Sequence, residues 1–338
     1  MIDDKIVTMG IESSCDETSV AIVADGREVL SNVILSQIDI HKIYGGVVPE
    51  IASRQHLESI NGVVEQALKN AGCTMEEIDV VGVTQGPGLV GALLIGIATA
   101  KSYALATGKP LVGVHHIHGH VCANYIEHKE LKPPFLALVV SGGHTNLIYV
   151  KSYMEYEILG QTRDDAVGEA YDKVARVLGL GYPGGPKIDK VAQMGNEDAV
   201  YFKRVFLEKG SKDFSFSGIK TGVLNYINGK RQRGEEINVP DVAASFQRAV
   251  LDVLVKKAVD ATVELKQDKL VLAGGVAANS KLKKMLEEKC ANHEIELFYP
   301  SVELSTDNGA MIACAAYYKY RSGQMDDLNL DADVNLKI

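Results

Sequence analysis

The order of the expected secondary structure elements is repeated in the two halves of the chain, and this repeat constrains the fold most. Apolar patterns in the first half predict strands at 5–12, 18–23 and 29–35, a helix at 49–70, a strand at 78–84, a helix that begins near 85–88 and a strand at 111–114. The second half predicts strands at 135–140, 145–150 and 156–159, and later a helix at 239–265, a strand at 269–273, a helix at 277–290, a strand at 295–298 and a helix at 308–321. Two units that each begin with three strands indicate an internal duplication.

Length and composition agree with two globular domains. A chain of 338 residues is too long for one ordinary core. Hydrophobic residues at 46% and charged residues at 23% are normal for a soluble enzyme. The net charge of −9 argues against a generic nucleic-acid binder but leaves room for a local basic patch. Five cysteines without paired spacing fit a reducing cytosol, so we expect a cytoplasmic protein.

No stretch is expected to cross or enter a membrane. The most apolar one, Leu89–Leu105, is interrupted by glycines, a threonine and Lys101. The amino terminus carries Asp3 and Asp4 where an export signal would be basic and then apolar, so export is not expected.

Each half has a polar or glycine-rich turn between its first two strands, at residues 13–17 and 141–144. Such a turn presents backbone N–H groups and hydroxyls that can bind phosphate, although an ordinary hairpin turn explains either one alone. A third glycine element, residues 272–280, lies between a strand and a helix, where the backbone can approach a nucleotide closely.

This arrangement resembles the actin, Hsp70 and sugar-kinase superfamily (the ASKHA fold). The resemblance implies an α/β fold with two duplicated lobes around a nucleotide and metal cleft, in which the two hairpin turns face each other. The N-terminal lobe would be residues 1–130, completed by a C-terminal helix at 308–338, and the C-terminal lobe would be residues 131–307.

Four of the nine histidines fall within residues 114–120. His116 and His120 are four residues apart, so on a helical turn their rings project from the same face. Two imidazoles in this arrangement suit a divalent metal, which then needs a third ligand from elsewhere in the chain. A pair of solvated helix histidines is the ordinary explanation for an isolated motif of this kind.

Five motifs together are similar to the TsaD family of tRNA N6-adenosine threonylcarbamoyltransferases, formerly described as O-sialoglycoprotein endopeptidases. These motifs are residues 11–18, 115–120, 140–145, 165–173 and 305–310, and the similarity extends from about residue 6 to 321. The bacterial type is implied, because Val139 stands where archaeal and eukaryotic relatives carry a metal-contacting tyrosine, and His144 where they carry asparagine.

The resemblance implies the residues of the site. The metal ligands would be His116, His120 and Asp307. The residues that hold the adenylate would be Val139, Val140, Ser141, Gly142, Gly143, Asp172, Gly185, Asp189 and Asn279. Amides of the turn at 141–143 would stabilise the departing phosphate. Asp16 and Glu17 are alternative proton acceptors, and both would otherwise complete the phosphate turn.

Two of these carboxylates have ordinary structural explanations. Asp307 could be the N-cap of the last helix, and Asp172 could pair with Arg176 one turn later.

The resemblance also implies the reaction and the partners. Threonylcarbamoyl-AMP would donate its acyl group to N6 of adenosine 37 in tRNAs that read codons starting with A. The divalent metal would be iron, with zinc and manganese also compatible with two histidines and an aspartate. A paralogous TsaB-like ASKHA subunit and a TsaE-like P-loop ATPase would assist. The basic segment 203–233 is a candidate tRNA surface, although a solvated helical surface is the usual explanation of such a charge run. The apolar stripe of helix 49–70 is a candidate docking face, with burial inside the first lobe as the more ordinary explanation.

Three other functions fit parts of the sequence. A metallopeptidase would typically carry HExxH, but Ile117 occupies the position of the glutamate. A small-molecule kinase or Hsp70-like ATPase would share the fold, yet such enzymes mostly position Mg²⁺ with carboxylates and water. A catalytically silent scaffold is disfavoured because every ligand position is filled.

Overall fold

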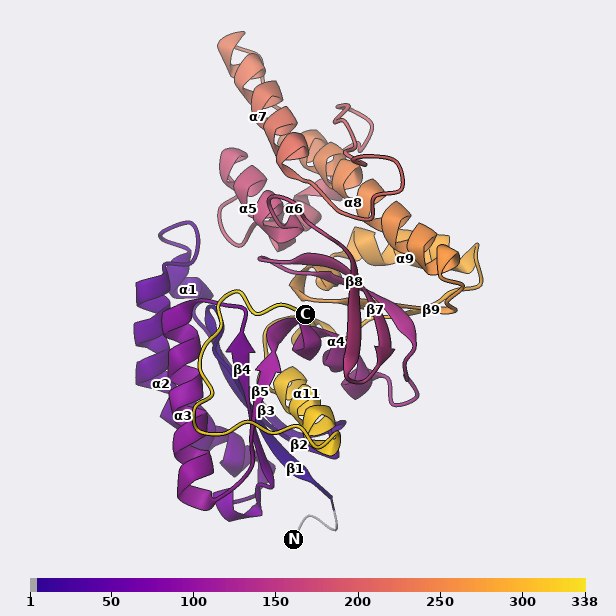
Figure 1. Ribbon diagram of the computed structural model, residues 1–338. Helices are drawn as coiled ribbons and strands as arrows, with labels where there is room; N and C mark the ends of the chain where they lie inside the picture. The colour runs from indigo at the N-terminus through magenta and orange to yellow at the C-terminus, as the bar shows by residue number, and fades with distance from the viewer. Residues whose placement is uncertain (1–4) are drawn as a thin grey trace. The chain divides into compact units, whose positions relative to one another are not determined.

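The computed structural model describes residues 5–338, so Asp3 and Asp4 lie outside the described residues. The chain divides by its contacts into two compact units, and each is described by itself (Figure 1). Unit 1 comprises residues 1–133, 152–155 and 300–338, and unit 2 comprises 134–151 and 156–299. This division places residues 300–307 with unit 1, whereas the expected lobe boundary lies at 307.

Unit 1 is built on a five-stranded sheet in the order β3-β2-β1-β4-β5. Its strands are β1 (Val7–Glu12), β2 (Glu17–Ala24), β3 (Glu28–Ser36), β4 (Val80–Gly86) and β5 (Leu111–His115). Its helices are α1 (Ile38–His41), α2 (Pro49–Ala71), α3 (Val90–Thr107), α4 (His116–Glu127), α10 (Val302–Ser305) and α11 (Gly309–Arg321), with a 3₁₀ turn at Met75–Glu77. Helices α2 and α3 cover one face of the sheet and α11 covers the other (Figure 1).

Unit 2 is built on a second five-stranded sheet in the order β10-β9-β6-β7-β8. Its strands are β6 (Phe135–Val140), β7 (Thr145–Ser152), β8 (Glu155–Gln161), β9 (Lys269–Ala273) and β10 (Glu296–Phe298). Its helices are α5 (Val167–Val177), α6 (Gly184–Ala192), α7 (Ser217–Gln232), α8 (Val239–Glu264) and α9 (Ser280–Ala291), with a 3₁₀ turn at Gly275–Ala278.

The two sheets have the same topology, which confirms the duplicated α/β fold. In each, the first strand is central and pairs antiparallel with the second and parallel with the fourth. The fourth strand then pairs parallel with the fifth. The central place of β1 and β6 agrees with their sequences, since mostly apolar residues fill both strands and every position of Val7–Glu12 and Phe135–Val140 is buried.

Three helices have ends that local residues define. Helix α4 begins at His116, so His116 and His120 both lie in its first turns. The expected helix 277–290 is divided at Asn279, whose side chain caps α9 by accepting a hydrogen bond from Leu282 N. The last helix ends at Arg321, as the apolar pattern predicts, because Gly323 takes a left-handed conformation. Residues 324–338, which the expected lobe division assigned to this helix, are a non-helical tail.

By length and composition alone, helix α3 could cross a membrane. No such stretch was expected from the sequence. A third of it is buried, and Leu93, Ile97 and Ala100 belong to the core of unit 1. A core helix of a folded domain has this pattern, so α3 alone is weak evidence for a membrane.

The apolar stripe of α2 also lies in the core. Ile60, Val64 and Ala67 are at most 2% exposed, so burial inside unit 1 accounts for the stripe. The docking face expected there is not available along most of its length, and Leu57, at 64% exposed, is the exception among the large apolar residues of the stripe.

Helix α11 approaches the sheet through glycines. A Cβ on Gly10 would lie 2.2 Å from the carbonyl oxygen of Gly309 and 2.3 Å from the amide of Ala313. Both neighbours are backbone atoms, so neither can move aside without shifting α11. The close approach therefore requires glycine at this position of β1.

Replacing Gly10 with alanine should lower the free energy of unfolding by about 1–3 kcal/mol, the usual cost of overpacking a core. Chemical denaturation measures this. Gly62→Ala on the exposed face of α2 is the matched control, because a Cβ there meets nothing within 4 Å. That control should be neutral or stabilising by up to about 1 kcal/mol, since alanine is the better helix former. Equal stability of the Gly10→Ala and wild-type proteins would contradict the packing.

Candidate functional site

The histidine-rich segment is positioned by the junction between β5 and α4. His115 ends β5 and caps α4, with its Nδ1 accepting a hydrogen bond from Ile117 N at 3.1 Å. Burial lowers the pKa of His115 to about 4, so it is a neutral cap. The helix starts with His116, and Ile117 points into the core at 1% exposed.

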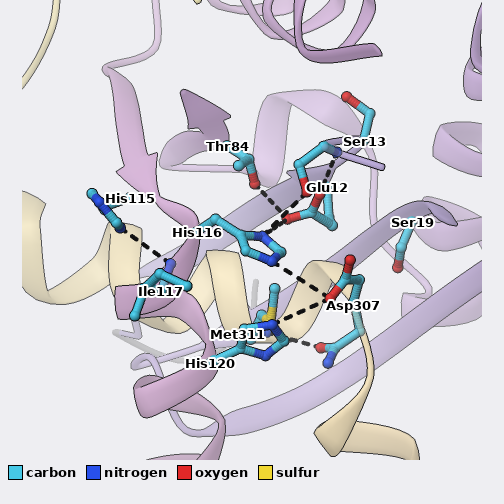
Figure 2. Close-up of polar contacts among 12 residues, drawn as sticks. Glu12, Ser13, Ser19, Thr84, His115, His116, Ile117, His120, Asp307 and Met311 are labelled. Atoms are coloured by element: carbon cyan, nitrogen blue, oxygen red, sulfur yellow. Dashed lines mark hydrogen bonds and ion pairs between the residues drawn. The ribbon is translucent and has the colours of Figure 1, made fainter. Parts of the chain in front are cut away.

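His116, His120 and Asp307 come together at one point in unit 1 (Figure 2). Asp307 Oδ1 lies 3.6 Å from His116 Nε2 and 3.2 Å from His120 Nε2. Both imidazoles are buried, at 5% and 1% exposed. Asp307 does not cap α11, because Asn308 does so by accepting from Met311 N at 3.0 Å. The N-cap role that the sequence suggested for Asp307 therefore belongs to Asn308.

The three donor atoms fit a divalent metal. Two ligands that each lie about 2.1 Å from a shared ion are separated by roughly 3.0–3.4 Å in octahedral or tetrahedral geometry. The His–Asp separations of 3.2 and 3.6 Å are close to this spacing. His120 Nε2 lies close to Asp307 Oδ1, yet this buried nitrogen has no hydrogen-bond partner among residues 5–338. A shared cation between them would satisfy both groups, and three protein ligands leave further coordination positions open.

Glu12, at the end of β1, supports the first of these histidines. It is fully buried, and its Oε2 accepts from Thr84 Oγ1 at 2.6 Å and lies 3.0 Å from His116 Nδ1. A carboxylate that holds Nδ1–H fixes the tautomer and turns Nε2 toward the metal. Glu12 stands in one of the family-like motifs, but sequence reasoning gave it no role because its partner is far along the chain.

The electrostatics of this cluster favour a cation. Burial alone would lower the pKa of His116, but the negative charges of Asp307 and Glu12 outweigh it and raise this pKa to about 9. Burial opposes ionisation of Glu12, yet His116 lowers the pKa of its carboxyl below the ordinary value. A site that draws a proton onto a buried imidazole has a negative potential, and a metal ion can replace that proton.

Asp16 and Glu17 lie in the turn between β1 and β2 of the same unit. Burial, followed by the negative charges of Asp16 and Asp307, raises the pKa of Glu17 well above its ordinary value. Its Oε1 accepts from Ser36 Oγ at 3.1 Å. The pKa of the Glu17 carboxyl is therefore moved in the direction that acid–base chemistry near neutral pH requires.

Unit 2 contains a separate cavity of about 350 Å³ at the start of α5, α6 and α9. Five of the residues predicted to hold the adenylate line it: Gly142, Asp172, Gly185, Asp189 and Asn279. A cavity of this size, with apolar and polar walls, suits a nucleoside-sized ligand. The glycine element after β9 contributes Gly275, Val276 and Ala278, as expected of a strand-to-helix turn at a nucleotide.

The polar wall of this cavity is held by Gln247 of α8. Its amide donates to Asp189 Oδ1 at 3.1 Å, and its carbonyl accepts from Asn279 Nδ2 at 2.9 Å. Asp172 is fixed separately, by accepting from Gly184 N at 2.6 Å. Sequence reasoning missed Gln247, because a glutamine inside an apolar helix carries no motif. The signal is in the structure, because Gln247 is 4% exposed and a buried polar side chain is expected to have hydrogen-bond partners.

Four of the predicted adenylate residues are not brought to the cavity wall. Val139 and Val140 are fully buried within β6, so their side chains are part of the core. Ser141 uses its amide inside the turn, where it donates to His144 O, and it does not line the cavity. Gly143 is exposed and is also absent from the lining. The turn thus contributes Gly142 alone to this wall.

Known proteins resemble this chain in sequence and in fold. A family model described as TsaD, tRNA N6-adenosine threonylcarbamoyltransferase, matches residues 28–314. A protein of Clostridium botulinum with that name is 58% identical over 335 residues, which cover 99% of this chain and 98% of that protein. Its counterpart in Clostridium beijerinckii is 57% identical over 336 residues, covering 99% of each.

Among solved structures, T.kodakarensis HypF matches with a TM-score of 0.65 at 15% identity, covering 96% of this chain and 50% of that protein. The activator of 2-hydroxyisocaproyl-CoA dehydratase from Clostridium difficile matches with a TM-score of 0.52 at 13% identity, covering 94% and 97%. These likenesses concern the fold alone. The sequence relatives decide the family, and the chain belongs to the TsaD family of tRNA N6-adenosine threonylcarbamoyltransferases.

Proposed function

We propose that this protein transfers the threonylcarbamoyl group from threonylcarbamoyl-AMP to N6 of adenosine 37 in tRNAs that read codons starting with A. The observation that carries this proposal is the 58% identity over 99% of the chain to a transferase of that name. In the reaction, the bond between the carbamoyl carbon and the phosphate oxygen breaks, a bond from that carbon to N6 forms, N6 loses a proton, and AMP leaves.

The residues of unit 2 would hold the adenylate part of the donor. Asp172 and Asp189 are carboxylates of the kind that accept hydrogen bonds from ribose hydroxyls. Both are already oriented by backbone or side-chain donors, so little side-chain ordering is needed on binding. Glu17 in unit 1 is our candidate for the group that accepts the proton from N6.

The metal would be held by His116, His120 and Asp307, with Glu12 behind His116. When bound, a divalent ion supplies a Lewis acid that polarises an oxygen of the donor or fixes its position. We propose iron, and the same donor set also accepts zinc or manganese.

The alternatives are less well supported by the site. A peptidase of the HExxH type needs a glutamate base beside the first histidine, whereas Ile117 is buried in the core. A kinase or ATPase of this fold would position Mg²⁺ with carboxylates and water, whereas the cluster here has two imidazoles and one carboxylate.

We also propose that a TsaB-like subunit and a TsaE-like ATPase assist in the cytoplasm. The charge of this chain supports the need for help, because −9 opposes binding of a polyanion. Most cations of the basic segment 203–233 are paired, which leaves few of them for RNA. Lys212 pairs with Glu264, Lys220 with Asp165, and Lys230 and Arg233 with Glu235.

Asp172→Ala and Asn279→Ala should each weaken binding of AMP by about 1–3 kcal/mol, the cost of losing a buried hydrogen bond. Titration calorimetry measures the affinity. Asn279→Asp is the matched variant, because it keeps the oxygen that caps α9, loses the amide that donates to Gln247 and adds a negative charge. If AMP affinity were unchanged in both alanine variants, the adenylate would have to bind elsewhere.

The proposed function is tested by incubating the purified protein with threonylcarbamoyl-AMP, unmodified tRNA and the two partner proteins. We expect modified adenosine and AMP in equal amounts, together with bound metal by elemental analysis of the same preparation. Absence of transfer by protein that contains metal, alongside cleavage of a glycoprotein or ATP, would favour one of the alternatives.

A further inference from the structure

A second, larger hollow lies in unit 2 away from the adenylate cavity. It is a groove of about 1090 Å³ between α8, α9 and the segment 197–206. A smaller hollow of about 240 Å³ adjoins it and shares Phe206, Lys256 and Asp260. None of the residues that line either hollow belongs to the adenylate cavity. The two together form one open trough, which we call the α8–α9 groove.

The α8–α9 groove is basic although the protein is acidic. Its larger hollow is lined by four acidic residues, Glu197, Asp252, Asp260 and Glu288, and by seven lysines and arginines, Lys203, Arg204, Arg248, Lys256, Lys281, Lys284 and Lys289. The excess of cations stands against a net charge of −9 for the whole chain. A local positive potential of this kind attracts an anionic partner and steers its approach.

The cations of the groove fall into two classes. Arg204, Arg248, Lys256 and Lys281 are paired with acids of the groove wall. Lys203, Lys284 and Lys289 are exposed and have no ion pair within the part of the chain that the structure describes. The paired residues fix the shape of the walls, and these three lysines leave their charge for a ligand.

The spacing of the free lysines suits an extended ligand better than a small anion. Lys284 and Lys289 lie five residues apart on α9, which is about 7–8 Å along the helix axis. Lys203 comes from the segment 197–206, which also lines the groove. Charges supplied by a helix and by a separate segment suit a ligand that runs along the groove.

An aromatic residue also faces solvent at the groove. Tyr201 is 79% exposed, and the guanidinium of Arg204 lies over its ring at 5.6 Å. Phe206 follows at 37% exposed, where the two hollows meet. Exposed aromatic rings beside cations are the usual platform on which unpaired bases stack, and stacking is tolerant of sequence.

We propose that the α8–α9 groove is an RNA-binding surface that contacts the phosphate backbone of tRNA through Lys203, Lys284 and Lys289. Tyr201 provides a stacking face beside them. The inference rests on the proposed function, because the RNA it names is the acceptor of that reaction. It places the tRNA contact at Lys203 and on α9, because most other cations of the basic segment 203–233 form ion pairs within unit 2.

The test is the triple variant Lys203→Glu, Lys284→Glu, Lys289→Glu. Binding of a labelled tRNA transcript is measured against salt, with the full chain alone and with the partner proteins. We expect tRNA affinity to fall at least tenfold at low salt. The slope of log affinity against log salt should fall by about two units, since each lost phosphate contact removes roughly 0.7–0.9 unit. Tyr201→Ala should lower affinity without changing the slope.

The matched control is Lys69→Glu, Lys101→Glu, Lys266→Glu, which changes the charge equally at lysines outside the groove. It should bind tRNA better than the groove variant, and both should bind AMP as the wild type does. Equal tRNA affinity and slope in the two triple variants would overturn the proposal. A groove variant that still binds tRNA but no longer binds one of the partner proteins would also overturn it. The groove would then be the binding site of an acidic protein.

The outcome is separable from that of the proposed function. Wild-type protein that binds tRNA through the groove but transfers nothing would leave the groove standing and refute the transfer reaction. Wild-type protein that modifies tRNA, together with a groove variant that modifies it at the same tRNA concentration, would refute the groove alone.

Discussion

Replacing Asp307 with alanine should abolish metal binding while the protein stays folded. Asp307 supplies the only carboxylate among the three ligands, and it lies 3.2 and 3.6 Å from the two imidazole nitrogens. Metal affinity should fall by more than about 100-fold. Replacing a residue that only hydrogen-bonds a ligand already lowers metal affinity by about 10–100-fold, and Asp307 is itself a ligand. The fold should persist, since the side chain is 20% exposed and does not cap α11. Elemental analysis after desalting measures the bound metal, and circular dichroism checks the fold.

His116→Ala should lose the metal as well, although it also leaves Glu12 buried without its imidazole partner. Asp307→Ala is therefore the cleaner variant. Glu303→Ala is its matched control, because Glu303 is an exposed acid on the neighbouring α10 and takes no part in the cluster. The control should retain metal at the wild-type stoichiometry. Full metal content in both His116→Ala and Asp307→Ala would refute these ligands.

Glu12→Gln should weaken metal binding by about 10–100-fold without removing any ligand. The carboxylate accepts from Nδ1–H of His116 and so presents Nε2 to the ion. Glutamine has the same size but lacks the charge that favours this tautomer and raises the basicity of the ring. Competition with a coloured chelator gives the dissociation constant, and this readout does not depend on turnover.

Thr84→Val is the matched control for Glu12→Gln. It removes the hydroxyl that donates to Glu12 at 2.6 Å but leaves the contact between Glu12 and His116 in place. Its effect on metal affinity should be much smaller than that of Glu12→Gln. A folded Glu12→Gln protein with wild-type metal affinity would show that Glu12 is merely a buried structural group.

The sequence by itself determined the order of strands and helices and hence the duplicated fold. Local periodicity was sufficient for this, because strands such as β6 and β9 begin and end where their apolar runs do. It also placed His116 and His120 on one face of a helix, since a spacing of four is a local property. Adenylate residues such as Asp172 and Asn279 came from resemblance in sequence, and both line the cavity.

Only the tertiary structure decided which groups meet. Asp307 joins the histidines, and Glu12 supports one of them, because β1, α4 and the start of α11 pack together in unit 1. Most cations of the basic segment are paired, and most of the α2 stripe is buried, by residues remote in sequence, as Lys212 is paired with Glu264. Pairing and burial depend on long-range contacts, and no local pattern records them.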